Sequence, residues 1–115
     1  MWVSVSFYKR KPGTSHEEFS RHWREIHGPL IAKNPKIARH IKRYVQHHLQ
    51  PNASVPGVQE LEFDGFSEVW FESMEDRQAM FAEPDFQNLV IPDEHNFIDM
   101  SITRTSMSDT PVVQV

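Results

Sequence analysis

Two spacings of apolar residues follow one another along this chain of 115 residues, and their order restricts the fold more than any other feature. Residues 2–9 alternate between apolar and polar side chains, a period of two that predicts a β-strand. A helix is expected next, because Ser15 and Glu18 have the spacing of a capping box. Apolar residues then recur every three or four positions and form one helical face. This face consists of Phe19, Trp23, Ile26 and Leu30.

A glycine–proline pair stands near the end of this predicted helix. Proline has no amide hydrogen and crowds the turn before it, so Gly28-Pro29 is expected to interrupt the helix. Alternatively, Pro29 opens a short second helical turn with Gly28 as its cap. The sequence leaves both interpretations open.

The remaining residues complete an α+β pattern. Further strands are expected over residues 39–49, 63–72 and 97–105, and helices from Ser73 and from Pro84 towards Ile91. Residues 92–95 are expected to form a turn, and residues 51–57 a loop that includes the glycosylation sequon at Asn52. The order strand, helix, strand, strand, helix, strand predicts the ferredoxin-like βαββαβ fold, a four-stranded antiparallel sheet with both helices on one face. The domain is expected to cover residues 1–105, followed by a C-terminal tail over 106–115.

Composition excludes several classes of function. The chain has no cysteine, so it has neither a disulfide nor a thiol nucleophile. Its formal net charge is −4. Basic residues cluster between Lys33 and Arg43, but no aromatic residues are interleaved with them, so nucleic acid is not an expected partner. No apolar run is long enough to span a membrane, and the first residues do not resemble a secretory signal. The expected location is the cytoplasm, with no membrane partner.

Strand alternation predicts which residues share a face of the sheet. If Val3, Val5 and Phe7 point towards the helices, the face away from them is aromatic. Six residues are expected on this open face: Tyr44, Gln46, His48, Phe66, Glu68 and Trp70. An exposed aromatic face requires a partner, and a second copy of the chain would cover it. We therefore expect a homodimer that binds a small hydrophobic or aromatic molecule in a cavity between the two sheets.

Four segments carry a resemblance to a known family. They are Tyr8–Leu30, Arg43–His48, Phe63–Phe71 and the pair Pro84–Phe86 with Pro92–Asp99. In this order they resemble the EthD family, and the resemblance runs from about residue 3 to residue 105. It implies a dimeric α+β barrel, a fold shared with many small cofactor-independent enzymes. The family's relatives include decarboxylases and dehydratases of aromatic polyketides and an isomerase of a methylmuconolactone.

Four residues are candidates for catalysis. His27 matches the histidine of the family's His-x-Pro-Leu motif and is expected to act as a general acid or base, or else to cap the helix. His48 ends the motif of the second strand and is either catalytic or a structural hydrogen-bonding residue. Tyr44 is a candidate donor to a substrate oxygen. Glu68 lies between two aromatic residues, where the pKa of a carboxyl could rise.

Substrate binding is expected to involve aromatic side chains and one aspartate. The aromatic candidates are Trp23, Phe66, Trp70 and Phe97. Asp93 matches the family's aspartate and is expected to cap or orient a loop near the mouth of the cavity. His16, His22 and His40 are interpreted as surface residues. No metal motif is present, and no cofactor is expected.

The favoured hypothesis is a cofactor-independent lyase, a decarboxylase or dehydratase of a small aromatic or polyketide-like, enolisable cyclic substrate. His27 and His48 would move protons, while Tyr44 or Glu68 stabilises the oxyanion. Three alternatives remain: an isomerase of a lactone, a cofactor-free monooxygenase, and a non-catalytic dimer that binds a small molecule.

Overall fold

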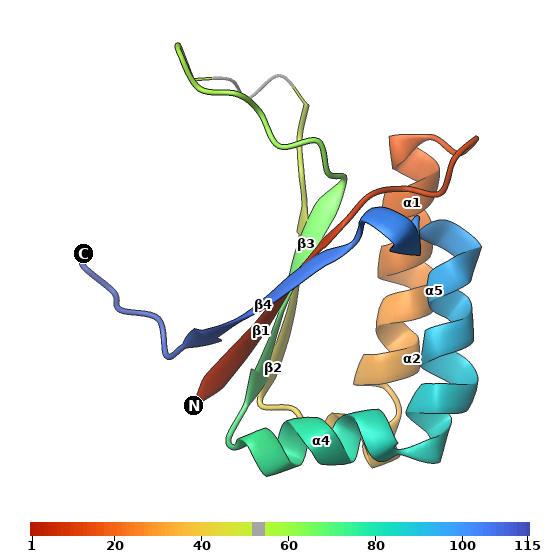
Figure 1. Ribbon diagram of the computed structural model, residues 1–115. Coiled ribbons are helices and arrows are strands. Elements are labelled where there is room, and N and C mark those ends of the chain that lie inside the picture. Colours follow the sequence, from red (N-terminus) through yellow and green to blue (C-terminus); the bar gives the residue numbers. More distant parts are fainter. Residues whose placement is uncertain (52–54) are drawn as a thin grey trace.

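The computed structural model describes residues 1–51 and 55–115, and the sequon at Asn52 lies outside these ranges. Four strands form one antiparallel sheet in the order β2-β3-β1-β4. They are β1 (Trp2–Tyr8), β2 (Arg43–His48), β3 (Gly65–Phe71) and β4 (Arg104–Asp109). The helices cover one face of this sheet, as Figure 1 shows. The predicted ferredoxin-like βαββαβ fold is confirmed.

The second layer consists of two helical regions, each built from consecutive helical segments placed end to end, and of the separate helix α4 (Met74–Ala82; Figure 1). The first region contains α1 (His16–His22), the π turn η1 (Trp23–His27) and α2 (Gly28–Ala32), and the short α3 (Pro35–Ala38) follows it. The second contains the π turn η2 (Phe86–Val90) and α5 (Ile91–Phe97). Between them in the sequence lie β2, β3 and α4 (Met74–Ala82), and the 3₁₀ turn η3 (Met100–Ile102) precedes β4. In the described part of the chain, no helix has the length and apolar character that crossing a bilayer requires.

A π turn precedes a proline in both stacked regions. Gly28 donates its N–H to the carbonyl of Trp23, and Ile91 donates to Phe86, so each bond spans five residues instead of four. Pro29 and Pro92 follow at the next position, where the wider turn accommodates a residue that lacks an N–H. The predicted interruption at Gly28-Pro29 is therefore wrong, because Gly28 is helical and opens α2 within a continuous stack.

The C-terminal part of the fold differs from the prediction. The expected turn at residues 92–95 is part of α5, which ends at Phe97. The last strand does not begin at Phe97 but at Arg104, and it continues to Asp109. Residues 106–109 therefore belong to the sheet, although they were expected in the tail.

The predicted assignment of strand faces is right for β3, whose Phe66, Glu68 and Trp70 lie on the open face, but wrong for β1 and β2. Residues that pair directly across two antiparallel strands lie on the same face of a sheet. Tyr44 pairs with Val69, and the face of this pair packs against the helices. Cross-strand pairing adds Gln46, His48, Ser67 and the β1 residues Ser4, Ser6 and Tyr8 to this helix-covered face. Val3, Val5 and Phe7 share the open face with Phe66, Glu68 and Trp70. The polar residues of β1 point inward because they line a cavity rather than a dry core.

Two clusters of buried residues hold the helices on the sheet. The larger lies beneath α2, α4 and η2 and contains Ile37, Phe71 and Val90. The smaller contains Phe19, Trp23, Phe97 and Ile98. Trp23 fits because Gly65 has no side chain: a Cβ there would overlap the Trp23 ring and lie 2.8 Å from the His47 carbonyl oxygen.

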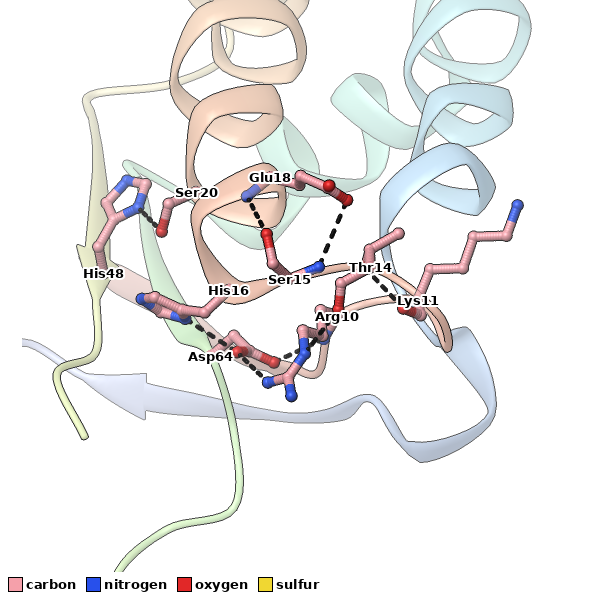
Figure 2. A network of polar contacts seen from close by, with 9 residues as sticks. All are labelled: Arg10, Lys11, Thr14, Ser15, His16, Glu18, Ser20, His48 and Asp64. Atoms are coloured by element: carbon pink, nitrogen blue, oxygen red, sulfur yellow. Dashed lines mark hydrogen bonds and ion pairs between the residues drawn. The ribbon is translucent and has the colours of Figure 1, made fainter. Parts of the chain in front are cut away.

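A buried aspartate connects the ends of β1 and α1. Asp64 accepts hydrogen bonds from the backbone N–H and the guanidinium of Arg10 and from Nδ1 of His16. Figure 2 shows this group beside the N-terminus of α1, where the predicted capping box of Ser15 and Glu18 is confirmed. Burial alone would raise the pKa of Asp64, but the donated hydrogen bonds outweigh it and lower the pKa. This end of the sheet and the start of α1 are therefore fixed together.

Candidate active site

A cavity of about 230 Å³ lies between the helix-covered face of the sheet and the helices. Its apolar wall includes Ile31, Val69, Phe71, Phe86 and Val90. Its polar side chains are Ser4, Ser6, Tyr8, His27, Tyr44, Ser67, Arg77, Glu94, Thr103 and Thr105. The cavity therefore lies within one chain, under the helices, and not between two sheets as expected. Its mixture of apolar walls and converging polar groups is typical of a small-molecule site.

His27 and Asp93 form a buried pair beside this cavity. His27 is 5% exposed and Asp93 8%, and 2.8 Å separates His27 Nδ1 from Asp93 Oδ2. The π turn η1 supplies His27, and the first turn of α5 supplies Asp93. The His27 ring also packs against Phe97, with 4.9 Å between the ring centroids.

Asp93 is held by two further donors. His22 Nε2 lies 2.9 Å from Oδ1, and the Asn96 amide donates to the same oxygen at 3.1 Å. Burial alone would raise the pKa of Asp93, but the donated bonds, that from Asn96 foremost, outweigh it and hold the pKa below its usual value. Asp93 is therefore ionised at neutral pH and can only accept hydrogen bonds.

The state of the His27 ring follows from this pair. Because the Asp93 carboxylate only accepts, His27 Nδ1 carries the hydrogen, and the lone pair of the neutral ring is on Nε2. Burial lowers the pKa of His27, although the hydrogen bond to Asp93 acts in the opposite direction. His27 is therefore neutral at pH 7 and can accept a proton.

Glu94, the next residue of α5, lines the cavity itself. Burial, with a smaller contribution from the charge of Asp93, raises the pKa of Glu94 to about 7. A carboxyl group with this pKa is half protonated near neutrality and can both give and take a proton.

Two tyrosine hydroxyls complete the polar part of the cavity. Burial raises the pKa of Tyr44 to about 12 and also raises that of Tyr8, so both stay protonated. The Gln46 amide donates to the Tyr44 hydroxyl oxygen at 3.1 Å. This leaves the Tyr44 hydrogen free to be donated to a ligand.

His48 does not line the cavity and instead contacts Gln46, the residue that donates to Tyr44. Its Nε2 lies 2.9 Å from the Gln46 amide oxygen and its Nδ1 2.9 Å from Ser20 Oγ, a contact visible in Figure 2. Both ring nitrogens are thus occupied by protein groups. His48 supports Gln46, which in turn contacts Tyr44.

The predicted site residues divide into two groups. Trp23, His27 and Tyr44 line the cavity, while Asp93 and Phe97 support His27. Phe66, Glu68 and Trp70 lie on the opposite face of the sheet, where Glu68 pairs with His47. This hydrogen bond lowers the pKa of Glu68, contrary to the rise that was considered from its aromatic neighbours.

Sequence reasoning missed Glu94, Tyr8 and His22. Glu94 follows Phe86 and Val90 at intervals of four, so a helical reading of this segment would have placed it on their face. The proline at residue 92 concealed that spacing. His22 was interpreted as a surface residue, and its contact with Asp93 depends on the packing of α1 against α5, which no local pattern gives.

The described ranges, residues 1–51 and 55–115, contain no group of three or more histidine, aspartate or glutamate side chains arranged to hold a metal ion.

Sequence comparison identifies relatives with named activities. A family model described as the EthD domain matches residues 11–101. The decarboxylase claH of Passalora fulva is 32% identical over 98 residues, which are 78% of this chain and 63% of that protein. The decarboxylase nsrE of Aspergillus novofumigatus is 31% identical, over 85% of this chain and 70% of that protein. The dehydratase CTB10 of Cercospora beticola is 26% identical, over 89% of this chain and 83% of that protein.

Solved structures share the fold at lower identity. An ethyl tert-butyl ether d (ethd) family protein from Bacillus halodurans superposes with a TM-score of 0.70 at 16% identity, over 96% of this chain and all of that one. A dimeric protein of unknown function and ferredoxin-like fold from Bacteroides fragilis gives a TM-score of 0.64 at 10% identity, over 94% of each chain. At these identities the likeness concerns the fold alone.

Proposed function

Because the chain belongs to the EthD domain family, we propose that it is a cofactor-independent lyase, a decarboxylase or a dehydratase. Its substrate is a small, enolisable cyclic compound of aromatic or polyketide-like character. The named activities of claH, nsrE and CTB10 support the reaction class. The chain spans only 63% of claH, so the activity proposed here is that of the domain and not of the longer protein.

The observation that carries the proposal is the convergence of three kinds of group in one cavity. His27 offers a basic nitrogen, Glu94 a carboxyl that titrates near neutrality, and Tyr8 and Tyr44 offer hydroxyls that stay protonated. All four line the same space. The catalytic set differs from the one expected from the sequence, since His48 and Glu68 lie outside the cavity.

In a dehydration, His27 Nε2 removes a proton from the carbon next to a carbonyl. The electron pair of the broken C–H bond forms an enolate, whose oxygen accepts hydrogen bonds from the tyrosine hydroxyls. The hydroxyl group on the neighbouring carbon then leaves as water, with a proton from Glu94, as the new double bond forms. The proton held by His27 then passes through solvent to the Glu94 carboxylate, which restores both groups.

In a decarboxylation, the same groups act on a carboxylate attached to an enolisable ring. Carbon dioxide leaves, and the electron pair of the broken C–C bond stays on the ring carbon. A tyrosine hydroxyl stabilises the developing negative charge on the ring oxygen, and Glu94 protonates the carbon. The balance is one proton consumed for each carbon dioxide released.

A panel of ortho-hydroxyaryl carboxylic acids and cyclic β-hydroxy ketones tests the proposal. Decarboxylation of the acids is measured as carbon dioxide release, and dehydration of the ketones as a change in ultraviolet absorbance. His27→Asn and Glu94→Gln should each lower kcat by about 10²–10⁴, the usual contribution of general acid–base catalysis. Glu68→Gln is the matched control, because Glu68 lies on the opposite face of the sheet and should leave turnover unchanged. Ligand binding by wild-type protein with no turnover anywhere in the panel would favour the non-catalytic alternative.

A further inference from the structure

One guanidinium in the cavity lacks a partner. Arg77, from α4, is among the residues that line the cavity, and its carbon Cζ lies 4.9 Å from the centre of the Phe81 ring. Arg77 Nε is enclosed, yet it has no hydrogen-bond acceptor. Within residues 1–51 and 55–115 it is the only buried side-chain nitrogen or oxygen in this state. An enclosed N–H of a cation without an acceptor is costly, so this position favours a ligand that supplies one.

No carboxylate of the described residues pairs with the Arg77 guanidinium. Among the described residues no ion pair involves Arg77. Asp76, its neighbour on α4, is bonded to Ser73 at the N-terminus of the helix. Glu94 also lines the cavity, but no ion pair joins it to Arg77.

Arg77 and Tyr8 lie towards different ends of the cavity. Along β1 the cavity is lined by Ser4, Ser6 and Tyr8. Tyr8 pairs with Gly65 at one end of β3, while Phe71 ends that strand about 20 Å away, shortly before α4 begins. Figure 1 shows α4 crossing this second end of the sheet. A ligand that spans these two ends has one part near Tyr8 and another near Arg77.

We propose that the cavity selects a flat, apolar acid whose carboxylate or other anionic group is bound by the Arg77 guanidinium. The apolar wall of Phe71, Phe86 and Val90 accepts the body of the ligand, and a fork of N–H donors matches an anion with two oxygens. This inference rests on the proposed use of the cavity as the ligand site, but not on which reaction occurs there.

The proposal also restricts a decarboxylase substrate. Decarboxylation draws negative charge out of the departing carboxylate, so a cation bound to that group stabilises the ground state more than the transition state. The anion at Arg77 is therefore one that remains in the product. A decarboxylase of this kind takes a substrate with a second acidic group.

A matched pair of probes tests the inference without any turnover. 2-Naphthoate and the uncharged 2-naphthamide have the same ring system, and Trp23, which lines the cavity, reports their binding through its fluorescence. Wild-type protein should bind the acid about tenfold or more tightly than the amide, as a charge-assisted pair in an enclosed site implies. Arg77→Met should remove this preference, and Arg77→Lys should retain part of it. Arg39→Met is the control, because Arg39 is 64% exposed on another helix end and should leave the preference unchanged.

The resonance of the Arg77 Nε–H group gives a second readout that is independent of affinity. In wild-type protein it should shift on addition of the acid and not of the amide, and thermal unfolding establishes that each variant is folded. Equal binding of both probes, or an acid preference that survives in folded Arg77→Met, would overturn the inference while leaving the cavity as a ligand site. Binding of the acid as expected, with no turnover of any acid or β-hydroxy ketone of the panel, would instead reject the proposed reaction.

Discussion

His27 donates Nδ1–H to Asp93 across 2.8 Å, and this bond joins the two helical regions directly beside the cavity. It fixes the tautomer of a neutral imidazole and leaves Nε2 as the basic atom. His27 contributes stability that is present above the unfolded pKa of about 6.5 and is lost as the pH falls through the lowered pKa of the folded state.

The first prediction concerns the pH dependence that this pair produces. Activity should fall on the acid side as His27 becomes protonated, at a pH below the usual value for histidine. Asp93→Asn removes the charge that favours the protonated ring, so the pKa of His27 should fall further. Histidine proton resonances followed by NMR through a pH titration measure this value. An unchanged His27 pKa in folded Asp93→Asn would contradict the pairing.

The second prediction concerns His22, which shares the Asp93 carboxylate with His27. The charge of His22 lowers the pKa of His27, so removing the ring in His22→Gln should raise it. The groups around this pair are Asp93 and Asn96 from α5 and Glu25 and Arg21 near His22 in sequence. His40→Gln is a suitable control, since it changes a histidine without contact to Asp93. The same NMR titration distinguishes the two variants.

The third prediction concerns Glu94, whose folded pKa is raised from 4.5 to about 7. An acid with a raised pKa contributes stability that is full below the unfolded value and is lost as the pH rises through the folded value. Wild-type protein should therefore lose stability between pH 4.5 and about 7, and Glu94→Gln should lose less of it. Urea unfolding on both sides of this window provides the measurement. Parallel stability curves for the two proteins would show that Glu94 is not buried as described.

The fourth prediction tests the contact of Gly65 with Trp23. An alanine methyl group would overlap the indole ring and the His47 carbonyl, so the strand or the ring must move. Gly65→Ala should lower the free energy of unfolding by about 1–3 kcal/mol, the usual cost of overpacking. Urea denaturation measures it. Gly13→Ala is the control, because Gly13 has open space around it and only its φ of 86° is unfavourable.

The fifth prediction concerns the open face of the sheet. Phe7, Phe66 and His47 stack on one another there, with ring centroids 5.1 and 4.0 Å apart. We expect this face to be covered by a second copy of the chain. Wild-type protein should then sediment as a dimer, and Trp70→Arg as a monomer. Arg39→Glu, on the opposite side, should not change the sedimentation. A dimer that persists in Trp70→Arg would place the interface elsewhere.

The order of elements could be predicted from the sequence because each one carries a local signal. The capping box of Ser15 and Glu18 and the Ser73 cap both begin helices in the structure. The orientation of β1 could not be obtained in this way. Apolar alternation was taken to mean that Val3 and Val5 face the helices, but the interior here contains a polar cavity and the open face is apolar.

Part of the candidate site could be predicted from the sequence motifs, and the other part became apparent only in the folded structure. His27 and Tyr44 were expected and line the cavity. Glu68 lies on the open face as expected, but the cavity is on the other face of the sheet. His48 is on the helix-covered face, where both its ring nitrogens contact protein groups and it does not line the cavity. Glu94 was missed because Pro92 predicted a turn, whereas a wider helical turn before the proline lets the helix continue.

The two π turns have a consequence for how this family can change in length. Each is one residue wider than an α-helical turn, so deleting a residue from Trp23–His27 or Phe86–Val90 would leave a regular helix with a proline in it. Such a deletion rotates everything on one side of it by about 100° relative to the other. Phe19 and Trp23 would then point away from the sheet while Ile31 stayed in place. Insertions and deletions are therefore expected in the segment between β2 and β3, and not within these helices.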